Sequence, residues 1–111
     1  MILKESLAIF KDVAKFSILR EAIDRVESRQ LAETTLIEMI KSAEAFKKQL
    51  SRDELSPLAK KIECIEYPLQ ELLKYFVEPP QYRLKVKKVI LLIDFLDLVS
   101  NDLIASLSIP S

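Results

Sequence analysis

Apolar residues recur in alternating steps of four and three over residues 31–50. The apolar positions of this run are Ala32, Leu36, Met39, Ala43, Phe46 and Leu50. This spacing puts one apolar side chain per turn on a single stripe of an α-helix, as in a coiled-coil heptad. The pattern predicts a helix that begins near Leu31. Thr35 and Glu38 match a capping box, so a later beginning at Leu36 is the alternative.

A second run of the same spacing covers residues 55–76. Its apolar positions are Leu55, Leu58, Ile62, Ile65, Leu69, Leu72 and Phe76. Ser56 followed by Pro57 is a helix start signal, because proline suits the first helical position. Pro68 lies inside the run, where it removes one backbone hydrogen bond and clashes with the preceding turn. The unbroken spacing therefore predicts one helix that is kinked at Pro68.

The last helix is predicted from about Tyr82 to Leu107, after Pro79 and Pro80 end the preceding one. The stripe that should face the core is Val86, Val89, Ile93, Leu96, Ser100, Leu103 and Leu107.

The first segment, residues 2–28, is less regular. One apolar face holds Leu3, Leu7, Phe10 and Ala14, and a second face holds Phe16, Leu19, Ile23 and Val26. The stripe changes phase around Ser17, which predicts either one helix that drifts across its neighbours or a bend at that residue. Arg20 with Asp24, and Glu21 with Arg25, have the spacing of ion pairs on one helix face.

Four amphipathic segments joined by short connections predict an all-α fold. The expected architecture is an antiparallel up-down four-helix bundle, whose third helix is the one kinked at Pro68. The chain shows no internal repeat and no change of composition, so residues 1–111 are predicted to form a single domain.

Composition narrows the function classes. The 111 residues include no glycine, no histidine and one cysteine, Cys64, with 17 basic against 17 acidic residues. Without glycine, phosphate loops and dinucleotide folds are disfavoured, and without histidine the commonest general base and metal ligand is missing. Zero net charge gives no overall attraction to nucleic acid. A single cysteine fits a cytoplasmic protein, and the lysine, glutamate and isoleucine bias fits a thermophile loosely.

The C-terminal helix is apolar enough to raise the question of a membrane span. Any window of about 20 residues in it includes several of Lys87, Lys88, Asp94, Asp97 and Asp102. Each charge at a bilayer centre costs at least about 2.5 kcal/mol. A membrane partner is therefore rejected.

On a helical wheel, the polar residues of this helix gather in one stripe. The stripe is Arg83, Lys87, Asp94, Asp97 and Asn101. Apolar residues fill roughly two thirds of the circumference, more than a bundle helix needs for its core face, so this helix is either the most enclosed of the four or binds in part outside the bundle. Leu84, Leu91 and Leu98 form a heptad-spaced ridge beside the polar stripe. We expect this ridge and its flanking charges to bind another helix.

The charges of the same helix oppose its macrodipole. Lys85, Lys87 and Lys88 lie at its positive start, and Asp97 and Asp102 lie toward its negative end, each unfavourable by about 0.3–1 kcal/mol when exposed. An antiparallel second copy would set basic ends over acidic ends, which predicts a homodimer. Neighbouring helices of the same bundle are an alternative source of partners, and plain solvation is a third interpretation.

No catalytic, cofactor or metal site is predicted. Asp94 and Asp97 share a helix face, yet helical metal sites usually add a histidine that this chain lacks. Cys64 lies beside the core stripe, where a small boundary residue is expected, with only Lys60 or Lys61 to activate it. An apolar-ligand pocket inside the bundle stays open as a further interpretation.

Two basic clusters support an alternative function. They are Lys47, Lys48 and Arg52, and then Tyr82, Arg83, Lys85, Lys87 and Lys88. Basic side chains with an aromatic ring can bind a nucleic-acid backbone and stack on a base. The favoured prediction is a non-enzymatic protein-protein interaction module, or a small subunit of a larger assembly, that docks through its C-terminal helix. The alternative is a nucleic-acid-binding accessory subunit that uses these clusters at helix ends.

Overall fold

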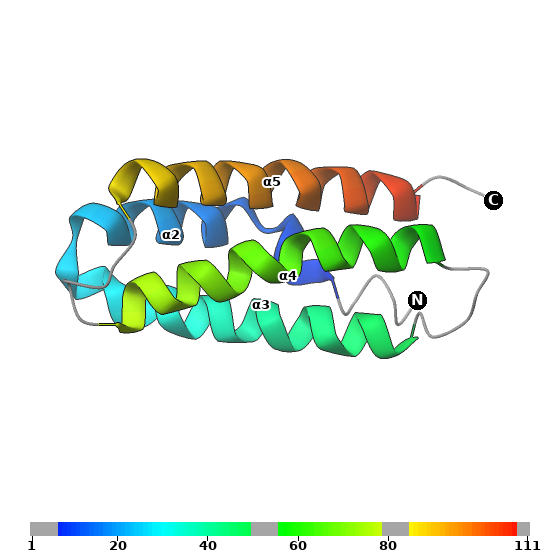
Figure 1. Ribbon diagram of the computed structural model, residues 1–111, viewed down its shortest axis with the longest axis horizontal. Coiled ribbons are helices and arrows are strands. Elements are labelled where there is room, and N and C mark those ends of the chain that lie inside the picture. The colour runs from blue at the N-terminus through cyan, green and yellow to red at the C-terminus, as the bar shows by residue number, and fades with distance from the viewer. Residues whose placement is uncertain (1–6, 50–55, 79–84, 109–111) are drawn as a thin grey trace.

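A computed structural model describes residues 7–49, 56–78 and 85–108 of the chain. Four α-helices make up most of it: α2 (Val13–Asp24), α3 (Arg29–Gln49), α4 (Ser56–Val77) and α5 (Val86–Ser108). Two short 3-10 helices, η1 (Ala8–Lys11) and η2 (Val26–Ser28), precede α2 and α3. Successive helices run in opposite directions, each packs against the next, and α5 returns to lie against α2 (Figure 1). The predicted all-α antiparallel four-helix bundle is confirmed.

The core lies along the predicted heptad stripes. The fully or nearly fully buried members of the α3, α4 and α5 stripes are Ala32, Leu36, Met39, Ala43, Phe46, Ile62, Ile65, Leu69, Leu72, Phe76, Val89, Ile93, Leu96, Ser100 and Leu103. Leu58 is half-buried, Leu50 and Leu55 lie outside the described residues, and the burial of Leu107 is likewise not described. Val86 is a correction, because its side chain is 48% exposed at the first turn of α5. One apolar residue per turn was therefore enough to predict which face of each long helix is buried.

The helix boundaries differ from the predicted ones by a few residues. α3 begins at Arg29, so the alternative beginning at Leu36 is wrong. α4 begins at Ser56, as the Ser56-Pro57 signal predicts. α5 begins at Val86 rather than Tyr82, and the Lys85 carbonyl accepts the first backbone bonds from Lys88 and Val89 at 2.9 and 3.1 Å.

Pro68 lies inside α4, which continues through it as one helix. Since proline has no N–H, the carbonyl four residues earlier loses its helical partner, and the ring presses on the previous turn. Figure 1 shows α4 changing direction near its middle, in line with the predicted kink. The proline is itself buried, so the bend keeps the stripe on either side of it against the core.

The first segment is broken at Asp12, neither drifting as one helix nor bending at Ser17. Asp12 has extended backbone angles, and its carboxylate accepts a hydrogen bond from the Ala14 N–H at 3.0 Å, which caps the start of α2. The break lets Leu7 and Phe10 of the segment before it reach the core independently of Phe16 and Leu19. It explains the change of phase that the sequence shows.

Two members of the predicted apolar faces of that segment point outward. Ala14 is exposed, and Val26, which lies in η2, is 75% exposed. Leu3 lies outside the described residues. Ile23 is half-buried, so the second face weakens toward its C-terminal end.

Ser100 places a hydroxyl in the buried stripe of α5, where it has no hydrogen-bond partner among the described residues. Since a buried unpaired hydroxyl is unfavourable, we expect Ser100→Ala to raise the free energy of unfolding by about 1 kcal/mol in urea denaturation. Ser106→Ala is the matched control, because the Ser106 hydroxyl accepts from Lys61 Nζ at 2.6 Å and donates to the Asp102 carbonyl at 3.0 Å. That variant should lose stability. Equal losses in both variants would contradict the interpretation of Ser100.

Candidate interaction surface

α5 packs against α4 on one side and against η1 and α2 on the other, and its outward side is uncovered. Its inward stripe is closed to solvent, with Val89, Ile93 and Leu96 at 0% exposure. The outward side of a bundle helix is usually polar. The outward side of α5 carries apolar side chains instead, so it is the candidate binding surface.

Five of the eleven exposed large apolar side chains among the described residues belong to α5. They are Val86, Ile90, Leu91, Phe95 and Leu98. The other six are distributed over α2, η2, α3 and α4. Leu91, Phe95 and Leu98 follow one another in steps of four and three, so they lie on one stripe, here called the outer ridge. Their exposures are 63%, 45% and 69%.

The outer ridge partly matches the predicted one. Leu91 and Leu98 are exposed as expected, whereas Leu84 and Arg83 lie outside the described residues. Phe95 was missed, although a signal for it exists: Lys88, Leu91, Phe95, Leu98 and Asp102 continue in steps of three and four. This is a second heptad stripe on the side of α5 opposite the core stripe.

The predicted polar stripe lies beside the ridge, on the side toward α2. Lys87, Asp94 and Asn101 are exposed, and Asp97 is partly covered. Arg20 of α2 reaches across and donates from one nitrogen to Asp94 Oδ1 at 3.4 Å and to Asp97 Oδ2 at 3.0 Å. Asn101 Nδ2 adds a hydrogen bond to Asp97 Oδ1 at 3.4 Å. The stripe is therefore a connected network that ties α2 to α5.

The predicted pairing of Arg20 with Asp24 is wrong, since Arg20 forms its ion pairs with Asp94 and Asp97. Two carboxylates three residues apart present their oxygens to the same terminal nitrogen of Arg20, which carries two N–H donors. Asp24, one turn away on α2, would give Arg20 only one carboxylate to pair with. Because Arg20 is 43% exposed, the network contributes modestly to stability.

The acidic end of α5 has a second cation from its own chain. Lys61 of α4 lies 3.0 Å from Asp102 Oδ2 and also donates to the Ser106 hydroxyl. Arg20 and Lys61 thus face carboxylates that the helix macrodipole disfavours. Neighbouring helices supply these partners, as the alternative interpretation expected. The acidic end of α5 therefore does not by itself require a second copy.

The basic start of α5 is different. Lys85, Lys87 and Lys88 are all exposed, and within residues 7–49, 56–78 and 85–108 no carboxylate pairs with any of them. Cations at a helix start are unfavourable because the macrodipole is positive there. This end of the outward surface keeps an unneutralised positive charge.

The two basic clusters lie at opposite ends of the bundle. Lys47 and Lys48 are in the last turn of α3, and Lys85 to Lys88 are at the start of α5, which Figure 1 places at the far end of the long axis. That axis measures 46 Å. Arg52, Tyr82 and Arg83 lie outside the described residues. The described lysines therefore do not form one basic surface of the kind that tracks a nucleic-acid backbone.

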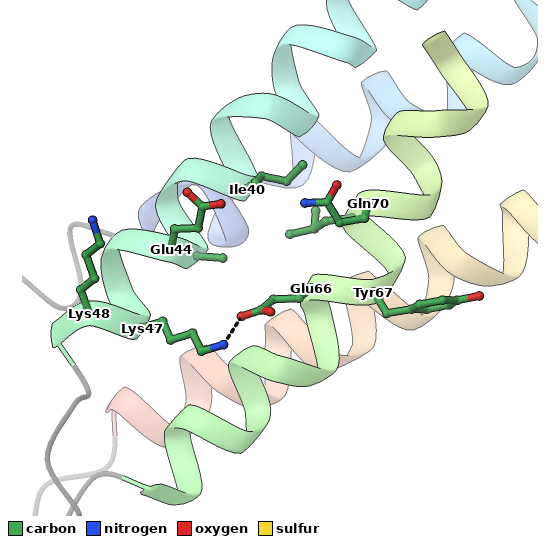
Figure 2. Close-up of a pocket in the computed structure, with 9 residues that line it drawn as sticks. Ile40, Glu44, Lys47, Lys48, Glu66, Tyr67 and Gln70 are labelled. Atoms are coloured by element: carbon green, nitrogen blue, oxygen red, sulfur yellow. Dashed lines mark ion pairs between the residues drawn. The ribbon is translucent and has the colours of Figure 1, made fainter. Parts of the chain in front are cut away.

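A groove of about 700 Å³ lies on the surface between α3 and α4. Ala43 and Leu69 are the buried part of its lining, and Lys47 bridges its walls with an ion pair to Glu66 at 3.1 Å (Figure 2). The hydrogen bond and the charge of Glu66 raise the pKa of Lys47 above its usual 10.5. The stabilisation from this pair is present below pH 10.5 and is lost as the pH rises through the raised pKa.

The groove does not select a ligand charge. Its charged lining residues are two lysines, Lys47 and Lys48, and two glutamates, Glu44 and Glu66. Figure 2 shows Lys48 directed away from α4 and Tyr67 directed away from α3, so neither reaches across the groove. The groove is open to solvent between two helices and is distinct from the predicted pocket inside the bundle, which stays a prediction.

The described residues hold no group of three or more aspartates, glutamates or cysteines that could bind a metal ion. Asp94 and Asp97, which share a helix face but are not predicted to bind a metal, hold the Arg20 guanidinium. Cys64 is exposed on α4, further from the core than its expected boundary position. No α-helix within the described parts of the chain has the length and hydropathy needed to cross a lipid bilayer.

Comparison of the chain with protein-family models, with curated proteins and with solved structures returned no match.

Proposed function

We propose that this chain is a non-enzymatic helical interaction module, a small subunit of a larger assembly, that docks through the outward side of α5. The observation that carries the proposal is the exposure of Leu91 and Leu98, at 63% and 69%, on the helix that also holds Ile90 and Phe95 partly open to solvent. Apolar side chains gathered on one helix face, with charges at the rim, are typical of protein-protein contacts.

The spacing of the outer ridge favours a helix as the binding partner. Side chains at steps of three and four fit between the side chains of a facing helix, which is how helices dock through narrow apolar stripes. The Arg20 network fixes Asp94 and Asp97 beside the ridge, so these charges can set the orientation of the partner.

Two features support a binding role over catalysis. The chain has no histidine, and the carboxylates closest to the ridge are occupied by Arg20. We also propose a cytoplasmic location, because a chain with one free cysteine does not depend on an oxidising compartment. Fractionation of cells that produce the tagged chain, with a marker for each compartment, tests that location.

A photoreactive phenylalanine derivative in place of Leu91 or Leu98 tests the docking surface in living cells. We expect a discrete cross-linked product, at least about tenfold stronger than from the same group at Ala45, because a docked partner covers the ridge. Ala45 is an exposed residue of α3, outside the α5 surface, and serves as the matched control position.

The mass of the product identifies the partner class. Twice the chain mass indicates a second copy, and any other single mass indicates a different protein. If the ridge positions give no product above that from Ala45, the proposed function is wrong.

A further inference from the structure

We infer that the partner of the outer ridge is a second copy of this chain, with the two α5 helices antiparallel about a two-fold axis between residues 94 and 95. This inference rests on the proposed function and names its partner. It follows from the spacing of the apolar residues, the distribution of charge along α5, and the area left uncovered.

The apolar residues pair with themselves in this arrangement. With the axis between Asp94 and Phe95, Leu91 lies opposite Leu98 of the second copy, and the two Phe95 rings lie beside the axis. An isologous interface needs such a surface that is complementary to itself. The outer ridge has this property because its two most exposed residues, Leu91 and Leu98, are equally far from the axis.

The charges favour the antiparallel orientation. The same axis puts Lys87 opposite Asp102 of the second copy and Lys88 opposite Asn101. Asp94 and Asp102 keep side-chain exposures of 57% and 63% despite their cations. Asp102 would be shared between Lys61 of its own chain and Lys87 of the second copy, while the excess negative charge of α5 lies at Asp94 and Asp97, which share one Arg20.

A parallel dimer would instead set the basic starts beside each other. Lys85, Lys87 and Lys88 would then face the same residues of the second copy, and like charges in contact disfavour association. No described carboxylate neutralises these lysines within the chain, and of the two arrangements only the antiparallel one brings a carboxylate, Asp102, opposite one of them, Lys87.

The area fits a small, reversible dimer. The three side chains of the outer ridge, at about 200 Å² each and a little over half exposed, leave roughly 350 Å² of apolar surface. A standard interface buries about 800 Å² on each partner, so the ridge with its flanking lysines and carboxylates makes a contact at the small end of the range. We therefore expect dissociation in roughly the micromolar range, where small interfaces of transient complexes lie.

Cysteine pairing tests both the partner and the orientation. In a Cys64→Ser background, which removes the exposed native thiol, chains with Leu91→Cys and chains with Leu98→Cys are mixed and gently oxidised. The antiparallel dimer predicts a Leu91→Cys to Leu98→Cys heterodisulfide about tenfold in excess of either homodisulfide, because only opposing positions bring the two Cα atoms within bonding range. Tags of different length separate the products.

Each other result overturns the inference. Predominant homodisulfides indicate a parallel pair, and disulfides no more frequent than from Ala45→Cys, with a wild-type chain that sediments as a monomer at high micromolar concentration, exclude a second copy. In that last case a cross-link from Leu91 or Leu98 to another protein leaves the proposed function standing, so the two failures are distinguishable.

Discussion

Leu96→Ala is expected to lower the free energy of unfolding by about 3 kcal/mol, whereas Leu98→Ala should change it by less than about 0.5 kcal/mol. The two leucines are neighbours on α5, two residues apart, and the chemical change is the same. Leu96 is fully buried, and Leu98 is 69% exposed. Truncation at Leu96 removes apolar contacts and leaves a cavity, while truncation at Leu98 leaves neither a cavity nor a buried unpaired group.

The measurement is urea denaturation followed by far-UV circular dichroism. Protein is kept dilute, so that association does not add to the stability of the folded state. A loss at Leu98 as large as that at Leu96 would show that Leu98 is covered within a single chain. The outer ridge would then not be a binding surface.

The double substitution Leu91→Asp and Leu98→Asp is expected to weaken self-association by at least about 100-fold. Each copy would bring two carboxylates into the centre of the interface, where they lose water and repel Asp94 and Asp102 of the other copy. Sedimentation velocity over a range of concentrations gives the change in the dissociation constant. The free energy of unfolding of the dilute chain should stay within about 0.5 kcal/mol, because both sites are exposed.

Leu31→Asp is the matched control for that experiment. Leu31 is 52% exposed on α3, so it receives the same chemical change outside the α5 surface. Association should be unaffected in this variant. Weakening of similar size in both variants would indicate that added negative charge, and not loss of the ridge, separates the copies.

The long helices were predictable because their burial follows one simple rule. Met39, on the α3 stripe, is buried because that face of the helix packs on its neighbours. Its burial could be predicted without knowing which side chains those neighbours contribute. The first segment was not predictable to the same degree. Its break depends on a local competition, in which the Asp12 carboxylate caps a new helix instead of continuing the first one.

The candidate surface was predicted in part. Leu91 and Leu98 could be recognised because they have no place on the core stripe of α5. Phe95 was counted with the broad apolar circumference, although its spacing from Leu91 and Leu98 places it on the same stripe. The Arg20 pairs join residues 74 and 77 positions apart in sequence, so the local spacing of Arg20 and Asp24 gave a misleading answer.

The interhelical ion pairs have a consequence for the sense in which the bundle winds. Among the described residues, Arg20 joins α2 to α5, Lys47 joins α3 to α4, and Lys61 joins α4 to α5. In a bundle wound in the opposite sense, the apolar stripes would still meet, but α3 and α5 would exchange sides around α4. Lys61 would then face α3 and Glu66 would face α5, away from their partners. Pairs that contribute little to stability can thus decide between two topologies that the core alone barely distinguishes.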